Sequence, residues 1–189
     1  MLYYVYMTGF FLARLFPIRV AYAIAGSIAW VYFWLSRRDR QDLCANLSVV
    51  LGPGASQTEI DRNIFRIFKN FAKYLVDFFR FPRFSEEYIS SNIDVSGREN
   101  LDICLSEGKG AILVALHLGN WELGAALVGA LGYDLCVIAL EHANPRINNF
   151  FNSQRAINRV KSIPTGANVR SCFKALNKNQ IVAIAADKD

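Results

Sequence analysis

The chain has 189 residues, of which 53% are apolar, and a formal net charge of +5 at pH 7. This length suffices for one folded domain with an appended segment. The positive charge favours an anionic partner, such as a membrane surface, an acidic carrier protein or a phosphorylated lipid. Nucleic acid is not expected, because no Lys/Arg-rich helix or aromatic–basic sheet motif accompanies the charge. The four cysteines form no C-x-x-C pair, so they predict packed thiols rather than a metal site.

Residues 1–40 are predicted to form a hydrophobic membrane-anchoring segment. Residues 20–35 are an uncharged run of about sixteen residues, with aromatic residues near its end and an arginine cluster after it. This order is typical of a helix whose basic end stays cytoplasmic. The run is shorter than the roughly twenty residues of a straight spanning helix, and a buried hydrophobic helix is the alternative. A signal peptide fits poorly, because no basic start and no small-residue cleavage site are present.

Residues 41–91 are predicted to be a helical region. The Gly-Pro-Gly sequence at 52–54 indicates a turn, and Ser56 with Glu59 indicates a capping box. Apolar residues then recur with helical spacing over residues 58–81, which predicts an amphipathic helix ended by a proline. The basic residues of this helix lie three or four positions apart: Arg62, Arg66, Lys69 and Lys73. They form either a solvated face or a face that docks an acidic acyl carrier or lipid headgroups.

Residues 92–189 alternate between short apolar runs and helical patterns. The expected strands are residues 93–95, 111–116, 134–140, 162–164 and 181–186, and the expected helices are 99–107, 121–131, 145–158 and 168–178. Helices between apolar strands indicate a mostly parallel or mixed sheet flanked by helices. The predicted fold class is therefore α/β, preceded by the N-terminal hydrophobic helical region.

The most informative stretch is residues 111–131. Its apolar strand ends just before His117, and a short polar break leads to Asn120, a good N-cap for the next helix. Glu122 lies in the first turn of that helix. In open α/β sheets, ligands bind outside the carboxyl ends of the strands. The sequence therefore predicts an imidazole facing a carboxylate at a ligand-binding edge.

His117 and Glu122 are five positions apart, so a continuous helix would place them on different faces. A strand–turn–helix corner lets the two side chains meet. A carboxylate bonded to one imidazole nitrogen leaves the other nitrogen to take a proton from a substrate hydroxyl. Backbone N–H groups at the helix start would then stabilise an oxyanion. The alternative is a structural histidine beside an acid favoured by the helix dipole.

Four further residues are candidates for the site. Arg155 and Arg159, four positions apart, form either a joint cationic face for phosphate or a solvated helix surface. Asp187 and Asp189 follow the last expected strand. They would orient a substrate hydroxyl, support His117 across the sheet, or hold a divalent cation. The Asp-x-Asp pattern also occurs in metal-dependent nucleotide-sugar glycosyltransferases, which are therefore an alternative enzyme class.

The block HLGNWE, residues 117–122, resembles the H-x4-D/E motif of the lysophospholipid acyltransferase superfamily. More narrowly, the block resembles the motif of the bacterial lipid A biosynthesis acyltransferases of lauroyl/myristoyl type, for which H-[FL]-G-N-W-E is characteristic. GRENL at 97–101 resembles the G-x-E-N-L of that family, and EGKG at 107–110 resembles its E-G-K-G turn. Asn144-Pro145 and the final D-x-D also fall at matching places.

This resemblance implies an acyltransferase that moves a fatty acyl chain from an acyl carrier protein or coenzyme A thioester to a hydroxyl of a membrane glycolipid or lysolipid. His117 would be the general base and Glu122 its orienter, with no covalent acyl-enzyme, metal or resident cofactor. The expected substrate-binding residues are Gly119, Asn120, Trp121, Arg155, Asp187 and Asp189. The implied location is the cytoplasmic face of the inner membrane.

Members of this family continue well past the D-x-D strand. We therefore expect the α/β core of 92–189 to be incomplete at its C-terminus, and a non-catalytic membrane-associated fragment is the third hypothesis.

Overall fold

The computed structural model describes residues 2–81, 85–166 and 169–187. The chain divides into two compact units. Residues 7–79 form a helical unit, and residues 2–6 with the described residues from 80 onward form an α/β unit.

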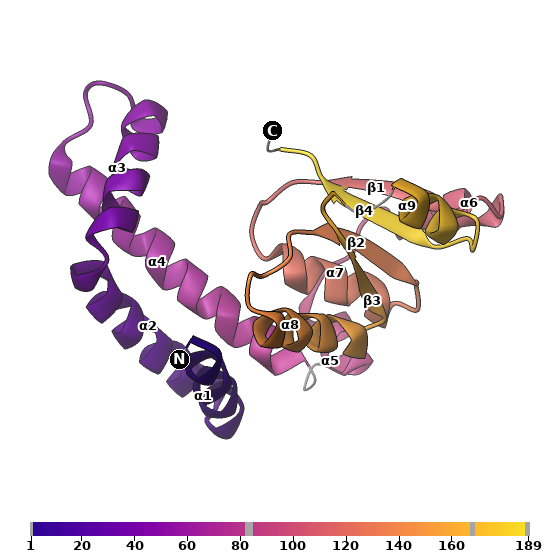
Figure 1. The fold of residues 1–189 in the computed structure, drawn as a ribbon, viewed down its shortest axis with the longest axis horizontal. Coiled ribbons are helices and arrows are strands. Elements are labelled where there is room, and N and C mark those ends of the chain that lie inside the picture. Colours follow the sequence, from indigo (N-terminus) through magenta and orange to yellow (C-terminus); the bar gives the residue numbers. More distant parts are fainter. Residues whose placement is uncertain (1, 82–84, 167–168, 188–189) are drawn as a thin grey trace. The chain divides into compact units, whose positions relative to one another are not determined.

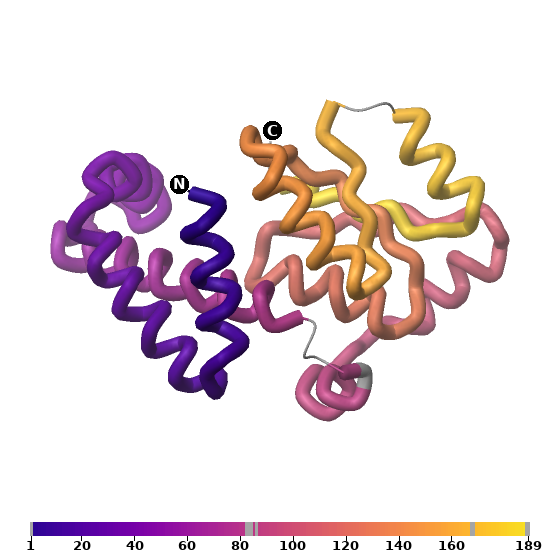
Figure 2. The backbone as a smooth tube through the Cα atoms, turned by 60° about the horizontal axis from the view of Figure 1, so that its bottom comes forward, coloured from indigo at the N-terminus to yellow at the C-terminus, as the bar shows by residue number. Residues whose placement is uncertain are grey.

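Residues 7–79 span four helices, of which the first begins and the last ends just outside this unit; they can be followed from indigo to magenta in Figure 2. They are α1 (Leu2–Leu15), α2 (Ile18–Leu35), α3 (Arg37–Leu51) and α4 (Gln57–Arg80). Helix α4 begins at the predicted capping box, where the Ser56 hydroxyl accepts the backbone N–H of Glu59 at 3.2 Å. Among the described residues, α2 is the helix that is long and apolar enough to cross a membrane by length and composition. The apolar helix predicted near the N-terminus is thus confirmed.

Helices α2 and α4 pack side by side in opposite directions. Near the start of α2, the Tyr22 hydroxyl donates to Asp77 at 2.5 Å, and near its end the ring of Phe33 lies 5.8 Å from that of Phe65. The buried face of α2 repeats every four residues: Ala21, Ala25, Ala29 and Phe33. Phe33 packs into a cluster with Ile60 and Ile64 of α4. A small-residue stripe followed by one large ring gives α2 its inward face.

The α/β unit is built on a parallel sheet, as predicted. Its strands are β1 (Ala111–Ala115), β2 (Leu135–Ala139), β3 (Val160–Pro164) and β4 (Ile181–Ala185), in the order β1-β4-β2-β3. The helices of this unit are α5 (Glu86–Asn92), α6 (Arg98–Ser106), α7 (Trp121–Ala130), α8 (Pro145–Ile157) and α9 (Val169–Leu176). The α/β fold class is therefore confirmed.

The helices cover both faces of this sheet. Alternate strand residues point to opposite sides: Leu135 and Ile181 pack with residues of α6 and α7, whereas Cys136 and Val182 pack with α9. Figure 1 shows α7 and α8 on one side of the strands and α9 on the other. The chain runs outward from β1 to β3 and then returns to place β4 between β1 and β2. This return brings the carboxyl end of β4 next to that of β1.

One prediction about the strands is wrong. Residues 93–95 form no strand, because Ile93 is the C-cap of α5 and the chain turns at Gly97, which has a left-handed φ of 80° and precedes α6. The β-formers Ile93 and Val95 favour a strand, but no neighbouring strand pairs with this segment in the described part of the chain.

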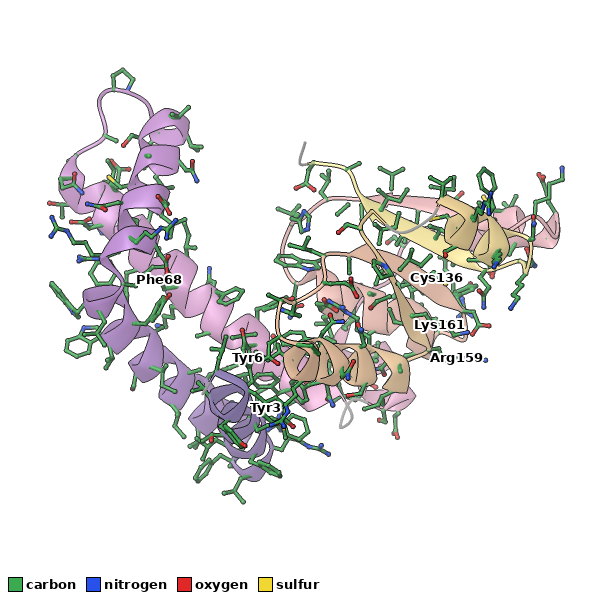
Figure 3. The ribbon with its side chains drawn as sticks, in the orientation of Figure 1. Tyr3, Tyr6, Phe68, Cys136, Arg159 and Lys161 are labelled. Atoms are coloured by element: carbon green, nitrogen blue, oxygen red, sulfur yellow. The ribbon has the colours of Figure 1, made fainter. Side chains whose placement is uncertain are left out.

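Two packing contacts position the helices that carry the site. A Cβ on Gly129 of α7 would lie 1.7 Å from the carbonyl oxygen of Asn158, so only glycine allows α7 this close to the chain entering β3. The ring of Tyr6, which is labelled in Figure 3, packs edge-on against Phe151 of α8, and the two ring centroids lie 5.5 Å apart. Both α7 and α8 are therefore held firmly against their neighbours.

The cysteines differ in burial. Cys136 is buried, and burial raises the pKa of its thiol. Cys44 and Cys172 are half-buried. Cys104, which was also expected to pack, is exposed because it lies on the outer side of α6.

Candidate active site

The site begins where two neighbouring parallel strands end. Ala115 of β1 is in register with Ala185 of β4, and His117 and Asp187 each follow two positions later. The Asp187 carboxylate accepts the backbone N–H of His117 at 3.0 Å through Oδ2. Its other oxygen lies 2.9 Å from Nδ1 of the same histidine. The register between β1 and β4 therefore places His117 and Asp187 next to each other.

The hydrogen bonds between Asp187 and His117 determine which ring nitrogen of the imidazole carries a proton. The backbone N–H of His117, and then its side chain, hold the pKa of Asp187 below the usual range of an aspartate. An ionised carboxylate can only accept hydrogen bonds, so Nδ1 carries the proton. In a neutral imidazole, Nε2 then keeps its lone pair. His117 and Asp187 have side chains that are 44% and 32% exposed, so a substrate can reach them.

The corner between β1 and α7 holds the histidine in place. Gly119 has a φ of +66°, a conformation that favours glycine. The Asn120 side chain accepts the backbone N–H of Leu123 at 3.0 Å, which confirms the predicted N-cap. The ring of Trp121, the first residue of α7, meets the imidazole of His117 edge-on with centroids 5.1 Å apart. These contacts restrict the orientation of the imidazole.

Glu122 lies in the interior, where it is only 6% exposed. Arg155 of α8 donates to it from Nε at 3.1 and 3.0 Å and from Nη2 at 2.5 Å. The remaining Nη1 group donates to Ser162 at 3.1 Å and to Asn152 at 3.4 Å. The Arg155 side chain is itself 11% exposed. This buried ion pair ties the start of α7 to α8 and β3.

The structure thus pairs the candidate residues differently from the prediction. In the described part of the chain, no hydrogen bond joins His117 to Glu122; Asp187 contacts the imidazole instead. The reason is topological, because β4 lies next to β1 and the first turn of α7 directs Glu122 toward α8. Support of His117 across the sheet was one of the three roles considered for Asp187, and the geometry agrees with it. Asp189 lies outside the described residues.

The prediction that Arg155 and Arg159 form a joint cationic face is wrong. Helix α8 ends at Ile157, so Arg159 lies beyond it and faces Asp134 at 3.5 Å and the carbonyl of Gly132 at 3.1 Å. Arg159, labelled in Figure 3, is exposed, whereas Arg155 is buried against Glu122.

Sequence reasoning did not find the polar neighbours of Arg155, which are Ser162 and Asn152. A hydroxyl within a short strand and an amide three positions before an arginine were the available signals. His142 lies nearby, with its ring 4.5 Å from that of Phe151. Burial, together with the positive charge of Arg155, lowers the pKa of His142.

No group of three or more potential metal ligands occurs among residues 2–81, 85–166 and 169–187. Asp187 is occupied by its two contacts with His117. The site as described is therefore an exposed histidine–aspartate dyad, beside the start of a helix whose backbone N–H groups carry partial positive charge. Such an arrangement is suited to removing a proton from a hydroxyl and to stabilising an oxyanion.

Comparison with known proteins identifies the family of this chain. A family model described as bacterial lipid A biosynthesis acyltransferase matches residues 1–189. The chain therefore belongs to the bacterial lipid A biosynthesis acyltransferase family.

Two relatives, named phosphatidylinositol mannoside acyltransferase, come from two strains of Mycobacterium tuberculosis. Each is 24% identical over 156 residues, which is 79% of this chain and 49% of the relative. The chain thus spans about half the length of the curated relatives it matches.

Proposed function

We propose that this protein is an O-acyltransferase that moves a fatty acyl chain from a thioester donor to a hydroxyl of a membrane glycolipid or lysolipid. The observation that carries the proposal is the His117–Asp187 pair, whose histidine is the first residue of the HLGNWE block, in a chain from this acyltransferase family. The donor is the thioester of an acyl carrier protein or of coenzyme A. The acceptor resembles a lipid A precursor and is reached at the cytoplasmic face of the inner membrane.

The reaction uses His117 first as a base and then as an acid. Nε2 takes the proton of the acceptor hydroxyl while the hydroxyl oxygen forms a bond to the thioester carbonyl carbon. The carbonyl oxygen becomes an oxyanion. When the tetrahedral intermediate collapses, the C–S bond breaks, and the thiolate receives the proton from Nε2. The products are an ester and a free thiol, and no covalent acyl-enzyme forms.

Asp187 stabilises the imidazolium that exists between the two proton transfers. A carboxylate on Nδ1 keeps the ring in the tautomer that exposes Nε2 as a base. The backbone N–H groups at the start of α7 face the developing oxyanion, and Asn120 fixes that helix start by capping it. Gly119 and Trp121 shape the surface on which the acyl donor lies.

Glu122 acts through Arg155 in this proposal, as a positioning residue. Its buried carboxylate holds the first turn of α7 against α8, which fixes the helix start beside the histidine. Arg155 has its donors directed at Glu122, Ser162 and Asn152. A phosphate of the substrate would therefore have to compete with these partners.

Glycolipid acceptors are supported by both comparisons, because a lipid A family description and a relative named for phosphatidylinositol mannoside each point to a sugar-bearing lipid. The net charge of +5 favours such anionic partners.

The test is transfer of a radiolabelled acyl chain to a lipid A precursor, with acyl carrier protein and coenzyme A donors assayed separately. His117→Ala is expected to lower turnover by about 10²–10⁴, because general-base catalysis contributes this much. His142→Ala, the matched control at the other histidine, keeps near-normal turnover. Circular dichroism verifies that both variants fold. Near-normal transfer by a folded His117→Ala would overturn the proposal.

A further inference from the structure

A groove of about 300 Å³ lies between α2 and α4, far in sequence from the His117 region. Helix α2 contributes Ala23, Gly26, Ser27 and Trp30 to its lining, and α4 contributes Phe65 and Lys69. Tyr22 closes one end. The groove lies wholly within the helical unit.

The groove has an apolar floor because a glycine replaces a side chain at its centre. A Cβ on Gly26 would meet its nearest neighbour, Cε of Lys69, at 3.9 Å. The methylene stem of Lys69 therefore lies over this hollow, while its ammonium group reaches the rim. The indole of Trp30 and the ring of Phe65 supply the aromatic walls. An occupant must offer an apolar portion to this floor.

The rim of the groove is cationic. The ammonium group of Lys73 lies 5.6 Å from the ring centroid of Tyr22, next to the same end of the groove. Among the described residues, no carboxylate lies within ion-pair distance of Lys69 or Lys73. The nearby carboxylate of Asp77 accepts the hydroxyl of Tyr22. Two ammonium groups beside an apolar hollow are therefore complementary to an anion attached to a hydrocarbon chain.

The outer surface of α2 indicates where such an occupant comes from. Large apolar side chains are exposed along it, including Ile28, Trp30, Val31, Trp34 and Leu35. Tryptophans are typical of the membrane interface. Helix α4 runs alongside α2 and places Lys69 next to Gly26, near the middle of α2. A spanning α2 would carry this lysine to the bilayer centre, which is costly, whereas an α2 in the plane of the interface keeps it at headgroup level.

We propose that the groove between α2 and α4 binds one anionic glycerophospholipid from the membrane in which α2 lies. The phosphate pairs with Lys69 and Lys73, and an acyl chain lies in the hollow beside Gly26 and the stem of Lys69, against Trp30 and Phe65. The basic side of α4 is thereby assigned to lipid headgroups rather than to an acidic acyl carrier, because the exposed apolar surface of α2 places the groove at the membrane interface, where phospholipids are the surrounding medium. This site is independent of the chemistry at His117.

The experiment uses Trp30 as the reporter. The sequence has three tryptophans, so Trp34→Phe with Trp121→Phe leaves Trp30 as the sole tryptophan, which is excited selectively over tyrosine. The full chain in this background is titrated with phosphatidylcholine vesicles that contain phosphatidylglycerol, with bromine on the acyl chains of one lipid or the other. Brominated phosphatidylglycerol is expected to quench Trp30 more strongly than brominated phosphatidylcholine at equal content.

Matched variants separate the groove from general charge. Lys69→Gln and Arg62→Gln each remove one positive charge from exposed positions seven residues apart on α4. Loss of one surface charge lowers vesicle affinity by roughly five-fold in either variant. In Lys69→Gln, vesicle affinity is expected to fall by about a further five-fold, and the preference for phosphatidylglycerol is expected to disappear. Arg62→Gln keeps this preference.

A second pair tests the hollow itself. Gly26→Leu fills the groove and is expected to abolish the selective quenching, whereas Gly26→Ala, whose Cβ makes an ordinary contact, preserves it. Circular dichroism verifies the helical content of each variant. If Gly26→Leu does not fold, Lys69→Gln alone tests whether the groove binds the lipid selectively. Equal losses in Lys69→Gln and Arg62→Gln, or equal quenching by the two lipids, would overturn the proposal. So would binding of acyl carrier protein that Lys69→Gln alone abolishes while vesicle binding persists.

Discussion

The Nδ1 atom of His117 and the Oδ1 atom of Asp187 lie 2.9 Å apart although 70 positions separate them in the sequence. Parallel pairing of β1 with β4 produces this contact, because it places the residues that follow each strand side by side. The carboxylate also accepts the backbone N–H of His117, so the aspartate fixes both the ring and the loop that carries it.

Asp187→Asn is expected to change the tautomer of His117. A carboxylate requires a proton on Nδ1, whereas an amide can donate to this nitrogen and so favour protonation of Nε2. The measurement is the ¹⁵N chemical shift of the two ring nitrogens at a pH where the ring is neutral. Glu141→Gln, which changes an exposed acid near the end of β2, serves as the control. An unchanged tautomer in Asp187→Asn would show that Asp187 does not orient the ring.

Arg155→Met is expected to destabilise the fold. Removing one partner of a buried ion pair leaves the other charge uncompensated, which costs about 3–5 kcal/mol. The free energy of unfolding should fall accordingly, and the double variant Glu122→Gln/Arg155→Met should lose less than the sum of the two single losses. Urea denaturation measures all three, with Arg159→Gln as the exposed control. An unchanged stability combined with a raised KM would instead show that Arg155 binds substrate phosphate.

His142 is expected to make stability depend on pH. Its pKa is lowered in the folded state by burial, and next by Arg155, so the unfolded chain binds more protons in this range. As far as His142 is concerned, the free energy of unfolding is therefore highest above the ordinary histidine pKa of about 6.5. It decreases as the pH falls through the lower, folded-state pKa.

Subtracting the profile of His142→Gln from that of the unaltered chain, both obtained by urea denaturation, isolates this contribution. The free energy of unfolding of the unaltered chain, relative to that of His142→Gln, is expected to grow as the pH rises across the same range. A flat difference would contradict the prediction.

Chelation is expected to leave acyl transfer unchanged. The proposed mechanism uses a histidine base, and both oxygens of Asp187 already accept hydrogen bonds from His117. Turnover is measured before and after treatment with EDTA. Loss of activity that manganese restores would favour the metal-dependent glycosyltransferase, in which Asp187 and Asp189 would hold the cation.

The sequence predicted the local features of this site well. The strand over 111–116, the cap at Asn120 and the helix starting at Trp121 all follow from short-range chemistry, namely apolar runs and side-chain capping. The HLGNWE block carried the family resemblance, and the family it indicated is the one whose model matches residues 1–189.

The partners of the charged residues could not be chosen from the sequence. Glu122 is close to His117 in the chain, so it was the natural candidate for the contact. The outcome depends on which strand lies next to β1, and that is set by the return of the chain to form β4. Burial of Arg155 likewise depends on α8 lying against α7, a tertiary contact that helical spacing does not specify.

The central claim is that His117 and Asp187 act as one catalytic unit. The most direct test is a double-variant cycle on kcat/KM for acyl transfer, using His117→Gln, Asp187→Asn and both together, each verified to be folded. Residues that act as a unit give strongly non-additive losses, so the double variant is predicted to be no slower than His117→Gln alone. Losses that multiply, with the double variant slower by the product of the two single effects, would contradict the claim.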